Sequence, residues 1–174
     1  MNGSVILITG PRASGKSTCA DSLHAVVPAS ILLHIDDLFH TVIAQDRARW
    51  NGHEADLYAV VARHQLALAR ELAGSGVTVI LDGTILPHQL TPLTDPPAVS
   101  LNIVALLPPL EECLANEHRP SRTVSAQEDR VCTTWREMQE WRNVHMPSVQ
   151  CVDAPALRAG RLIDDLCRRL RGGY

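Results

Sequence analysis

A glycine-rich segment directly after an apolar run is the feature that most constrains this chain of 174 residues. The run is Val5–Ile8, and Gly10–Ser17 follows it with the pattern G-x-x-x-x-G-K-[ST]. Glycine at both ends of such a loop lets the backbone approach a phosphate closely. The successive N–H groups at the start of the next helix then form an anion-binding concavity. The segment therefore predicts a strand, a phosphate-binding loop and a helix, in that order.

The side chains of this loop predict binding of ATP with Mg²⁺. Lys16 is the only lysine among the 16 basic residues, and it stands where a compact ammonium group reaches the β- and γ-phosphates. The Ser17 hydroxyl is the expected Mg²⁺ ligand, and Thr18 is placed near the α-phosphate. The predicted nucleotide-binding residues are Gly10, Ala13, Ser14, Gly15, Lys16, Ser17 and Thr18.

Apolar runs alternate with segments of helical periodicity along the whole chain. The predicted strands are Val5–Ile8, Ile31–Ile35, Val77–Leu81, Val99–Leu107 and Val149–Val152. The predicted helices are Lys16–Val26, a long helix from about Asn51 to Gly74 or Gly76, Leu110–Glu117, Gln127–Asn143 and Ala156–Arg171. Continuous apolar strands are typical of a parallel sheet covered on both faces. We therefore expect one domain over residues 1–174, with a three-layer α/β P-loop fold and a five-stranded parallel sheet.

Two adjacent carboxylates follow the second apolar run. Asp36 is expected beside the loop, where it could orient an attacking hydroxyl group and accept its proton. Asp37 is expected to cap the next helix; the alternatives left open are the reverse assignment and neither role. Asp82, which follows the third apolar run, is expected to hold Mg²⁺ directly or through water; a turn aspartate before Gly83 is the alternative.

Arginines after the fourth strand could close over the phosphates. Arg119, Arg122 and Arg130 lie in a possible lid segment around residues 117–130. They would neutralise charge during transfer, or else be solvated surface side chains. Arg12 in the loop is expected to point to solvent, with steering of a phosphate as the alternative.

Other side chains are expected to have structural roles. Trp135, Met138 and Trp141 share one helix face and are assigned to the core rather than to an acceptor platform. His34 and His40 are expected to be satisfied or exposed rather than in contact with the acceptor.

Composition excludes several classes of protein. A net charge of -3 and a single lysine disfavour nucleic acid as a partner. The five scattered cysteines contain no C-x-x-C pair, which favours free thiols in a reducing cytoplasm. The N-terminus has neither a signal-peptide pattern nor a membrane-spanning length, so we expect a cytoplasmic protein without membrane contact. The oligomeric state is left open.

The order of these features resembles that of adenylate-kinase-like small kinases, and more closely the chloramphenicol phosphotransferase family. The resemblance covers nearly the whole chain and rests on the phosphate loop, Asp36 with Leu38, Gly52 before a long helix, Asp82, and Val152-Asp153. It implies ATP, Mg²⁺, a five-stranded parallel sheet and phosphorylation of a primary hydroxyl group. Lys16 and Ser17 would act on ATP and Mg²⁺, and Asp36 on the acceptor. The segment Thr41–Gly52 is expected to line the acceptor pocket and has no recognisable match, so the resemblance supports a small-molecule kinase more than it supports chloramphenicol as the acceptor.

Other functions remain as alternatives. A nucleoside or nucleotide kinase differs only in its acceptor, and a polynucleotide 5′-kinase is disfavoured by the acidic charge. A GTPase lacks N-K-x-D, and a dinucleotide-binding enzyme lacks G-x-G-x-x-G. A protein that binds nucleotide without turnover, in resistance or regulation, is the alternative from a different class.

Overall fold

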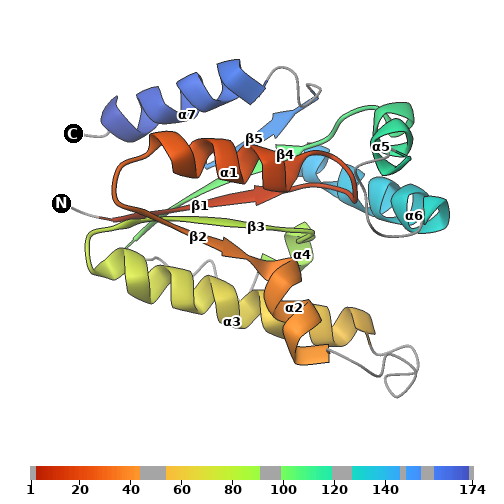
Figure 1. Ribbon diagram of the computed structural model, residues 1–174, viewed down its shortest axis with the longest axis horizontal. Coiled ribbons are helices and arrows are strands. Elements are labelled where there is room, and N and C mark those ends of the chain that lie inside the picture. The colour runs from red at the N-terminus through yellow and green to blue at the C-terminus, as the bar shows by residue number, and fades with distance from the viewer. Residues whose placement is uncertain are drawn as a thin grey trace.

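A five-stranded parallel sheet forms the centre of the computed structural model (Figure 1). The structure describes residues 3–43, 54–90, 99–118, 127–145, 148–153 and 159–172. The strand order is β2-β3-β1-β4-β5. The strands are β1 (Ser4–Thr9), β2 (Ser30–His34), β3 (Thr78–Gly83), β4 (Ser100–Leu106) and β5 (Val149–Val152). The predicted fold class and all five predicted strands are confirmed.

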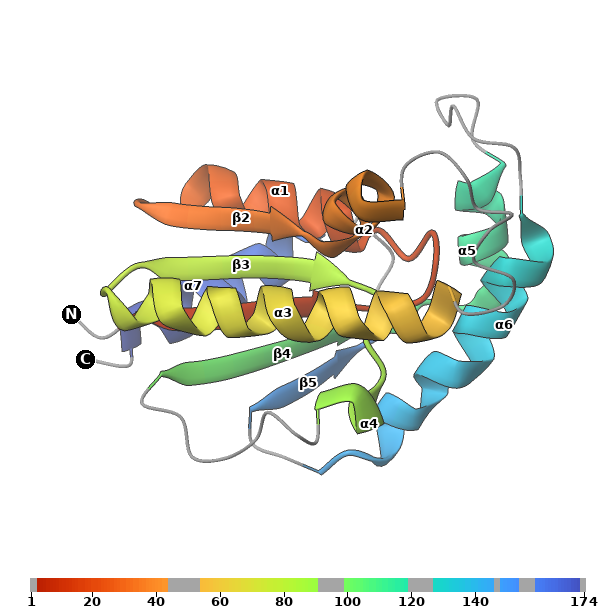
Figure 2. The same ribbon diagram turned by 90° about the horizontal axis from the view of Figure 1, so that it is seen from below.

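Helices cover both faces of the sheet. Figure 1 shows α1 (Lys16–Val26) and α7 (Ala159–Gly172) on one face, and α3 (Glu54–Gly74) on the other. Seen from below in Figure 2, α3 runs along the sheet, while α5 (Leu110–Glu117) and α6 (Glu128–Met138) stand together at one end. A 3₁₀ helix, η3 (Gln139–Asn143), continues α6. These helices agree with the predicted ones, although Asn51 lies outside the described residues.

Side chains of successive strand residues alternate between two cores. Val5 and Leu7 of β1 pack on the side of α3, together with Leu66. Ile6 and Ile8 pack on the other side, with Leu23 of α1. Both faces are therefore buried, which explains why β1 is continuously apolar rather than alternating.

Two short helices were missed. The second strand ends at His34, and α2 (Ile35–Ile43) begins at once, so Asp36 and Asp37 lie within its first turn. The prediction that Asp37 caps the next helix from outside is wrong. Both carboxylates instead lie near the positive end of the α2 dipole, where negative charge is favourable. The other helix, α4 (Pro87–Leu90), lies in the connection after β3.

The predicted core and thiol roles are largely confirmed. Met138 and Trp141 are fully buried, and Trp135 is half-buried with its indole N–H donating to the Pro108 carbonyl oxygen at 2.8 Å. All five cysteines are free thiols; Cys19 and Cys113 are buried, whereas Cys151 is exposed. In the described part of the chain, no helix is long and apolar enough to cross a membrane.

Candidate active site

The loop between β1 and α1 has the backbone of an anion-binding site. Ala13 and Gly15 have positive φ angles of 62° and 88°. The α1 helix then begins at Lys16 without a side-chain cap, so its first N–H groups lack the usual partner and point toward the loop. Gly10 is required by packing, because a Cβ there would lie 2.5 Å from the Leu106 carbonyl oxygen and 2.7 Å from Ser14 Oγ.

Two polar side chains of the loop are buried without an obvious structural need. Lys16 is only 7% exposed, and Ser14 is 2% exposed. The Ser14 hydroxyl has no hydrogen-bond partner in the described parts of the chain. Buried polar groups are normally satisfied, so an unpaired donor beside left-handed backbone and a buried ammonium group fits a bound phosphate.

Asp82 of β3 contacts the first turn of α1. It is 3% exposed, and its Oδ2 accepts a hydrogen bond from Ser17 Oγ at 2.8 Å. Burial raises the pKa of the Asp82 carboxyl above its ordinary value, although the Ser17 hydroxyl, His34 and Lys16 oppose this. The structure thus brings together Ser17 of α1 and Asp82 of β3, the two residues predicted to hold Mg²⁺, which are 65 positions apart in the sequence.

His34 is the second partner of this carboxylate. Its Nδ1 contacts Asp82 Oδ1, and its Nε2 lies 3.6 Å from Asp21 Oδ1 on α1. The strand register places His34 directly opposite Asp82. The expectation of a satisfied imidazole is therefore confirmed. The signal for the contact was present in the sequence, since His34 lies near the end of one predicted strand and Asp82 directly follows another at the same edge of a parallel sheet.

The donor set near Ser17 fits Mg²⁺ only with help from a ligand. Among the residues that the structure describes, no group of three or more His, Cys, Asp or Glu side chains could hold a metal ion by itself. Ser17 and Asp82 supply hard oxygen atoms, and Mg²⁺ is commonly held by one or two such protein groups together with phosphates and water. The residues present fit that mode of binding.

Asp36 is fixed by a residue that the sequence did not single out. Tyr58 of α3 donates from its hydroxyl group to Asp36 Oδ1 at 2.8 Å and accepts from the Thr84 N–H at 2.8 Å. Because Thr84 follows Asp82 by two residues, this contact holds Asp36 at the edge of the sheet where β3 ends. Burial and the Asp36 charge raise the pKa of Tyr58 well above its ordinary value. Nothing in the local sequence around Tyr58 indicates this role.

The side chain of Arg12 does not point to solvent, so that expectation is wrong. Arg12 Nε and Nη2 lie 3.0 and 2.9 Å from Glu117 Oε1, and the Glu117 side chain is fully buried. The Arg12 N–H also donates to Thr134 Oγ1 at 3.2 Å, and Asn116 Nδ2 donates to the Ala13 carbonyl oxygen at 3.0 Å. A buried carboxylate at the end of α5 attracts the guanidinium group, so α5 and α6 are joined directly to the phosphate loop.

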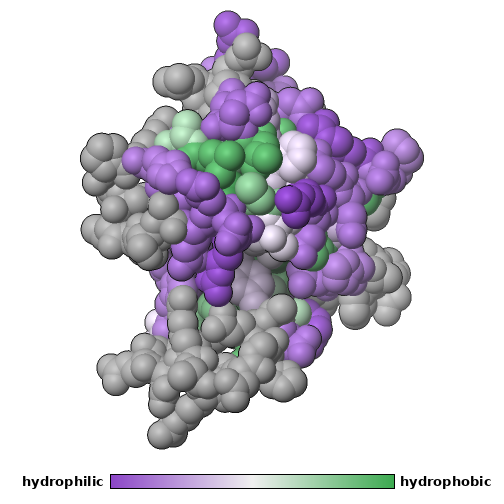
Figure 3. Space-filling model, turned by 90° about the vertical axis from the view of Figure 1, so that its right-hand side faces the viewer, coloured by the Kyte–Doolittle hydropathy of each residue, from purple (hydrophilic) through white to green (hydrophobic). Residues whose placement is uncertain are grey.

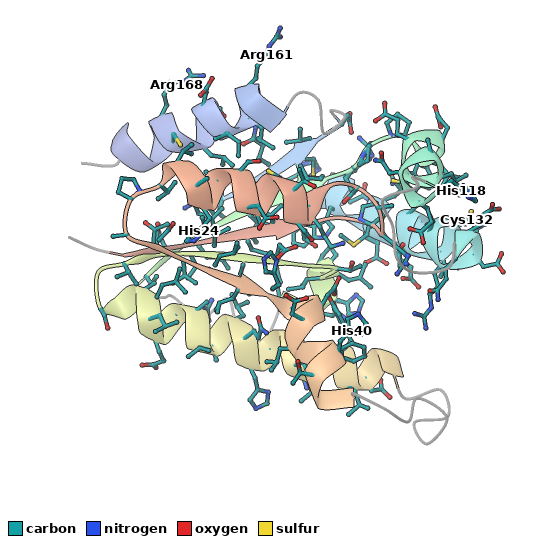
Figure 4. The ribbon with its side chains drawn as sticks, in the orientation of Figure 1. His24, His40, His118, Cys132, Arg161 and Arg168 are labelled. Carbon is teal, nitrogen blue, oxygen red and sulfur yellow. The ribbon has the colours of Figure 1, made fainter. Side chains whose placement is uncertain are left out.

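The other predicted site residues are only partly described. Arg119 and Arg122 lie outside the described residues. Arg130 is exposed in the first turn of α6, and Thr18 is exposed on α1. Figure 4 shows His40 on α2, and His118 with Cys132 at the end of the molecule formed by α5 and α6. Figure 3 views that end, where hydrophilic residues surround a smaller hydrophobic area.

Comparison with solved structures shows the same fold. A sugar kinase from Janibacter sp. HTCC2649 is 18% identical, with a TM-score of 0.67 over 97% of this chain and 95% of that one. Shikimate kinase from Acinetobacter baumannii, in complex with shikimate, is 16% identical, with a TM-score of 0.63 over 98% and 94%. The tunicamycin resistance protein of Deinococcus radiodurans is 17% identical, with a TM-score of 0.63 over 97% and 95%.

Sequence comparison gives a family. No curated protein matches this sequence. The model of one family, AAA_33, described as an AAA domain, matches residues 5–145 and so includes the phosphate loop, Asp36 and Asp82. The chain has a P-loop nucleotide-binding fold of the kinase type, and it belongs to the AAA_33 family of AAA domains.

Proposed function

We propose that this protein is an Mg-ATP-dependent kinase that transfers the γ-phosphoryl group to a hydroxyl group of a small molecule. The observation that carries the proposal is a pair of differently held carboxylates at one edge of the sheet. Asp82 is buried and bonded to Ser17, whereas Asp36 is half-buried and held by Tyr58. A protein that only binds nucleotide needs the first carboxylate but has no use for the second.

In this proposal the loop binds the triphosphate. The N–H groups from Ala13 to Thr18 and the Lys16 ammonium group contact the phosphate oxygens. Lys16 lies in the interior, where a charge interaction is screened less than it is in water. Its positive charge therefore stabilises negative charge that develops on the transferred group and on ADP.

Ser17 and Asp82 are the residues that would hold Mg²⁺. When bound, the ion would neutralise phosphate charge and align the β- and γ-phosphates. The hydrogen bond between the two residues keeps the Ser17 hydroxyl group at the edge of the sheet. His34 holds the other carboxylate oxygen, so Asp82 is oriented from both sides.

Asp36 acts on the acceptor. Its carboxylate orients the acceptor hydroxyl and takes its proton as the oxygen bonds to the γ-phosphorus and the bond to the β–γ bridging oxygen breaks. ADP leaves with that bridging oxygen, and the proton passes from Asp36 to solvent. Because the transition state of phosphoryl transfer is loose, the contribution of the base is chiefly positioning and late proton removal.

Arg119 and Arg122 are proposed to neutralise charge during transfer. They belong to a segment whose two ends are joined near the loop. The Gln127 N–H donates to Glu117 Oε1 at 3.2 Å, and His118 Nε2 lies 2.7 Å from Glu128 Oε1. Since Glu117 also binds Arg12, both ends of the segment are anchored to the phosphate loop.

The acceptor class is proposed from chemistry and likeness together. Resemblance to the chloramphenicol phosphotransferase family, and the fold shared with a sugar kinase and a tunicamycin resistance protein, favour a hydroxylated small molecule, antibiotics included. A nucleoside or a nucleoside monophosphate is the nearest alternative on the same fold.

The test is ADP release from Mg-ATP with a panel of hydroxylated antibiotics, sugars, shikimate, nucleosides, nucleoside monophosphates and 5′-hydroxyl oligonucleotides. Wild type and Asp36→Asn are run side by side, with the product identified by mass. We expect one acceptor class to gain a single phosphoryl group, and the variant to bind ATP normally without transferring it. Tight ATP binding with no acceptor-dependent release across the panel would favour a non-catalytic nucleotide-binding protein.

A further inference from the structure

The Tyr58 hydroxyl group lies between two elements that come from different parts of the chain. It is 2.8 Å from the Thr84 nitrogen and 2.8 Å from Asp36 Oδ1. A backbone N–H can only donate, so the phenol oxygen accepts from Thr84. The single phenol proton must then be directed to Asp36, because a carboxylate can only accept. The direction of both hydrogen bonds is therefore fixed by the chemistry of the groups.

The tyrosine ring is also fixed in place. Phe39 meets it edge-on, with ring centroids 5.1 Å apart and an interplanar angle of 68°. Gly83 leaves room for the hydroxyl group, because a Cβ at that position would lie 2.9 Å from Tyr58 Oη and 2.7 Å from Ile35 Cδ1. The glycine after Asp82 thus permits close approach of both α2 and α3 to the end of β3.

Only one oxygen of Asp36 is used in this network. Oδ1 accepts from Tyr58, whereas Oδ2 has no partner among the residues that the structure describes. A charge-assisted hydrogen bond to one oxygen restricts rotation of the carboxylate. The remaining oxygen is then held in one orientation relative to β3 and, through Asp82, to Ser17.

We infer that Tyr58 is a positioning residue for phosphoryl transfer, which holds Asp36 by Oδ1 so that Oδ2 is presented to the acceptor hydroxyl. The inference rests on the proposed kinase activity and assigns to Tyr58 a role that acts only through Asp36. The substitution Tyr58→Phe distinguishes this positioning role from a packing role, because it keeps the ring against Phe39 and removes only the hydroxyl oxygen.

The first test compares Tyr58→Phe with wild type and with Ser22→Ala. Ser22 is the matched control, because Ser22→Ala also removes a single hydroxyl group, one on α1 that donates to the Thr18 carbonyl oxygen at 2.7 Å. We expect Tyr58→Phe to lower kcat for the acceptor about tenfold, in line with loss of one hydrogen bond to a charged group. The KM for ATP should stay within about twofold, and Ser22→Ala should match wild type.

A double-mutant comparison separates positioning from structure. If Tyr58 acts only through Asp36, then adding Tyr58→Phe to Asp36→Asn changes the residual rate by less than about twofold. A tenfold further loss in that background would overturn the inference in favour of a structural role. Normal turnover of Tyr58→Phe alone, with Asp36→Asn inactive, would overturn it while leaving the proposed kinase intact.

A spectroscopic test needs no acceptor. Tyr58 and Tyr174 are the only tyrosines, so ionisation of Tyr58 can be followed in Tyr174→Phe by tyrosinate absorbance. Loss of the Asp36 charge should shift this ionisation to lower pH, because that charge raises the pKa of Tyr58. An unchanged titration in Asp36→Asn would overturn the contact itself. A shifted titration in a protein that phosphorylates nothing would support the contact but overturn the proposed function, and with it the positioning role.

Discussion

The two sides of the candidate site are built in different ways. The phosphate side is one continuous segment, Gly10–Thr18, whose main binding groups are backbone N–H groups and one lysine. The acceptor side is assembled from side chains of α2, α3 and the end of β3. Its contacts join residues that are 22 and 26 positions apart. A sequence motif predicts the first kind of site because its binding groups are close together in the chain. No local pattern predicts the second, whose residues are far apart in the sequence.

One buried residue joins the two sides. The Ile85 carbonyl oxygen accepts from Thr9 Oγ1 at 3.0 Å and from Trp141 Nε1 at 2.8 Å, and the Ile85 N–H donates to Thr9 Oγ1 at 3.0 Å. Thr9 precedes the phosphate loop, and Ile85 follows the Tyr58 contact at Thr84 by one residue. The two differently built sides of the site are therefore held together by this hydrogen-bonded junction as well as by the Ser17–Asp82 hydrogen bond.

The largest expected effect is on the phosphate side. Lys16→Ala should lower kcat, with a rise of about 3 kcal/mol or more in the activation free energy, because a preorganised, buried charge is lost. Arg168→Ala is the control, since Arg168 projects from α7 into solvent (Figure 4). Rates of ADP formation decide the matter, and near-normal turnover of Lys16→Ala would refute the assignment of the loop.

A smaller effect is expected where the loop meets α5. Arg12→Ala removes the cation that pairs with the buried Glu117 carboxylate, and should lower the free energy of unfolding by about 2–4 kcal/mol. Adding Glu117→Gln should restore part of this loss, because the buried charge is then gone. Urea unfolding of the single and double variants measures both. Equal stability of Arg12→Ala and wild type would mean that the loop is not anchored by this pair.

The junction itself can be weakened without changing shape. Thr9→Val keeps the volume but leaves the Ile85 N–H buried without its partner, which should reduce the free energy of unfolding by about 1–3 kcal/mol. The exposed Thr41→Val should change it by less than about 0.5 kcal/mol. Thermal unfolding measures the Tm of both variants, and equal losses in Tm would argue against a special role for the junction.

The smallest expected effect is a gain in stability, in contrast to the losses predicted above. Because the pKa of Asp82 is raised in the folded state, its ionised form disfavours folding at neutral pH, and this penalty disappears as pH falls through the raised pKa. Asp82→Asn should therefore raise the free energy of unfolding at pH 7 by on the order of 1 kcal/mol, a few degrees in Tm, while it lowers turnover. A drop in Tm would show that the contacts of Asp82 with Ser17 and His34 outweigh its burial.

Much of the fold follows from local patterns in the sequence. Five apolar runs predict the five strands because a parallel sheet buried on both faces needs continuous apolar segments. Helical periodicity predicts α1 and α5 to the residue and α3 closely. The α2 helix was not predicted because Ile35 continues the apolar run of the second strand. The end of β2 at His34 is set by its pairing in the sheet, which the local sequence does not indicate.

The sequence alone predicts the phosphate loop with Lys16 and Ser17, the five buried strands, and the carboxylates Asp36 and Asp82 that follow two of the apolar runs. Local geometry suffices for these features, since each depends on spacing within a strand, a turn or one helix. The tertiary structure decided that Tyr58 holds Asp36, that His34 and Ser17 share Asp82, and that Arg12 pairs with Glu117. Those contacts depend on how distant elements pack against one another, and packing is set by the whole core rather than by any one segment.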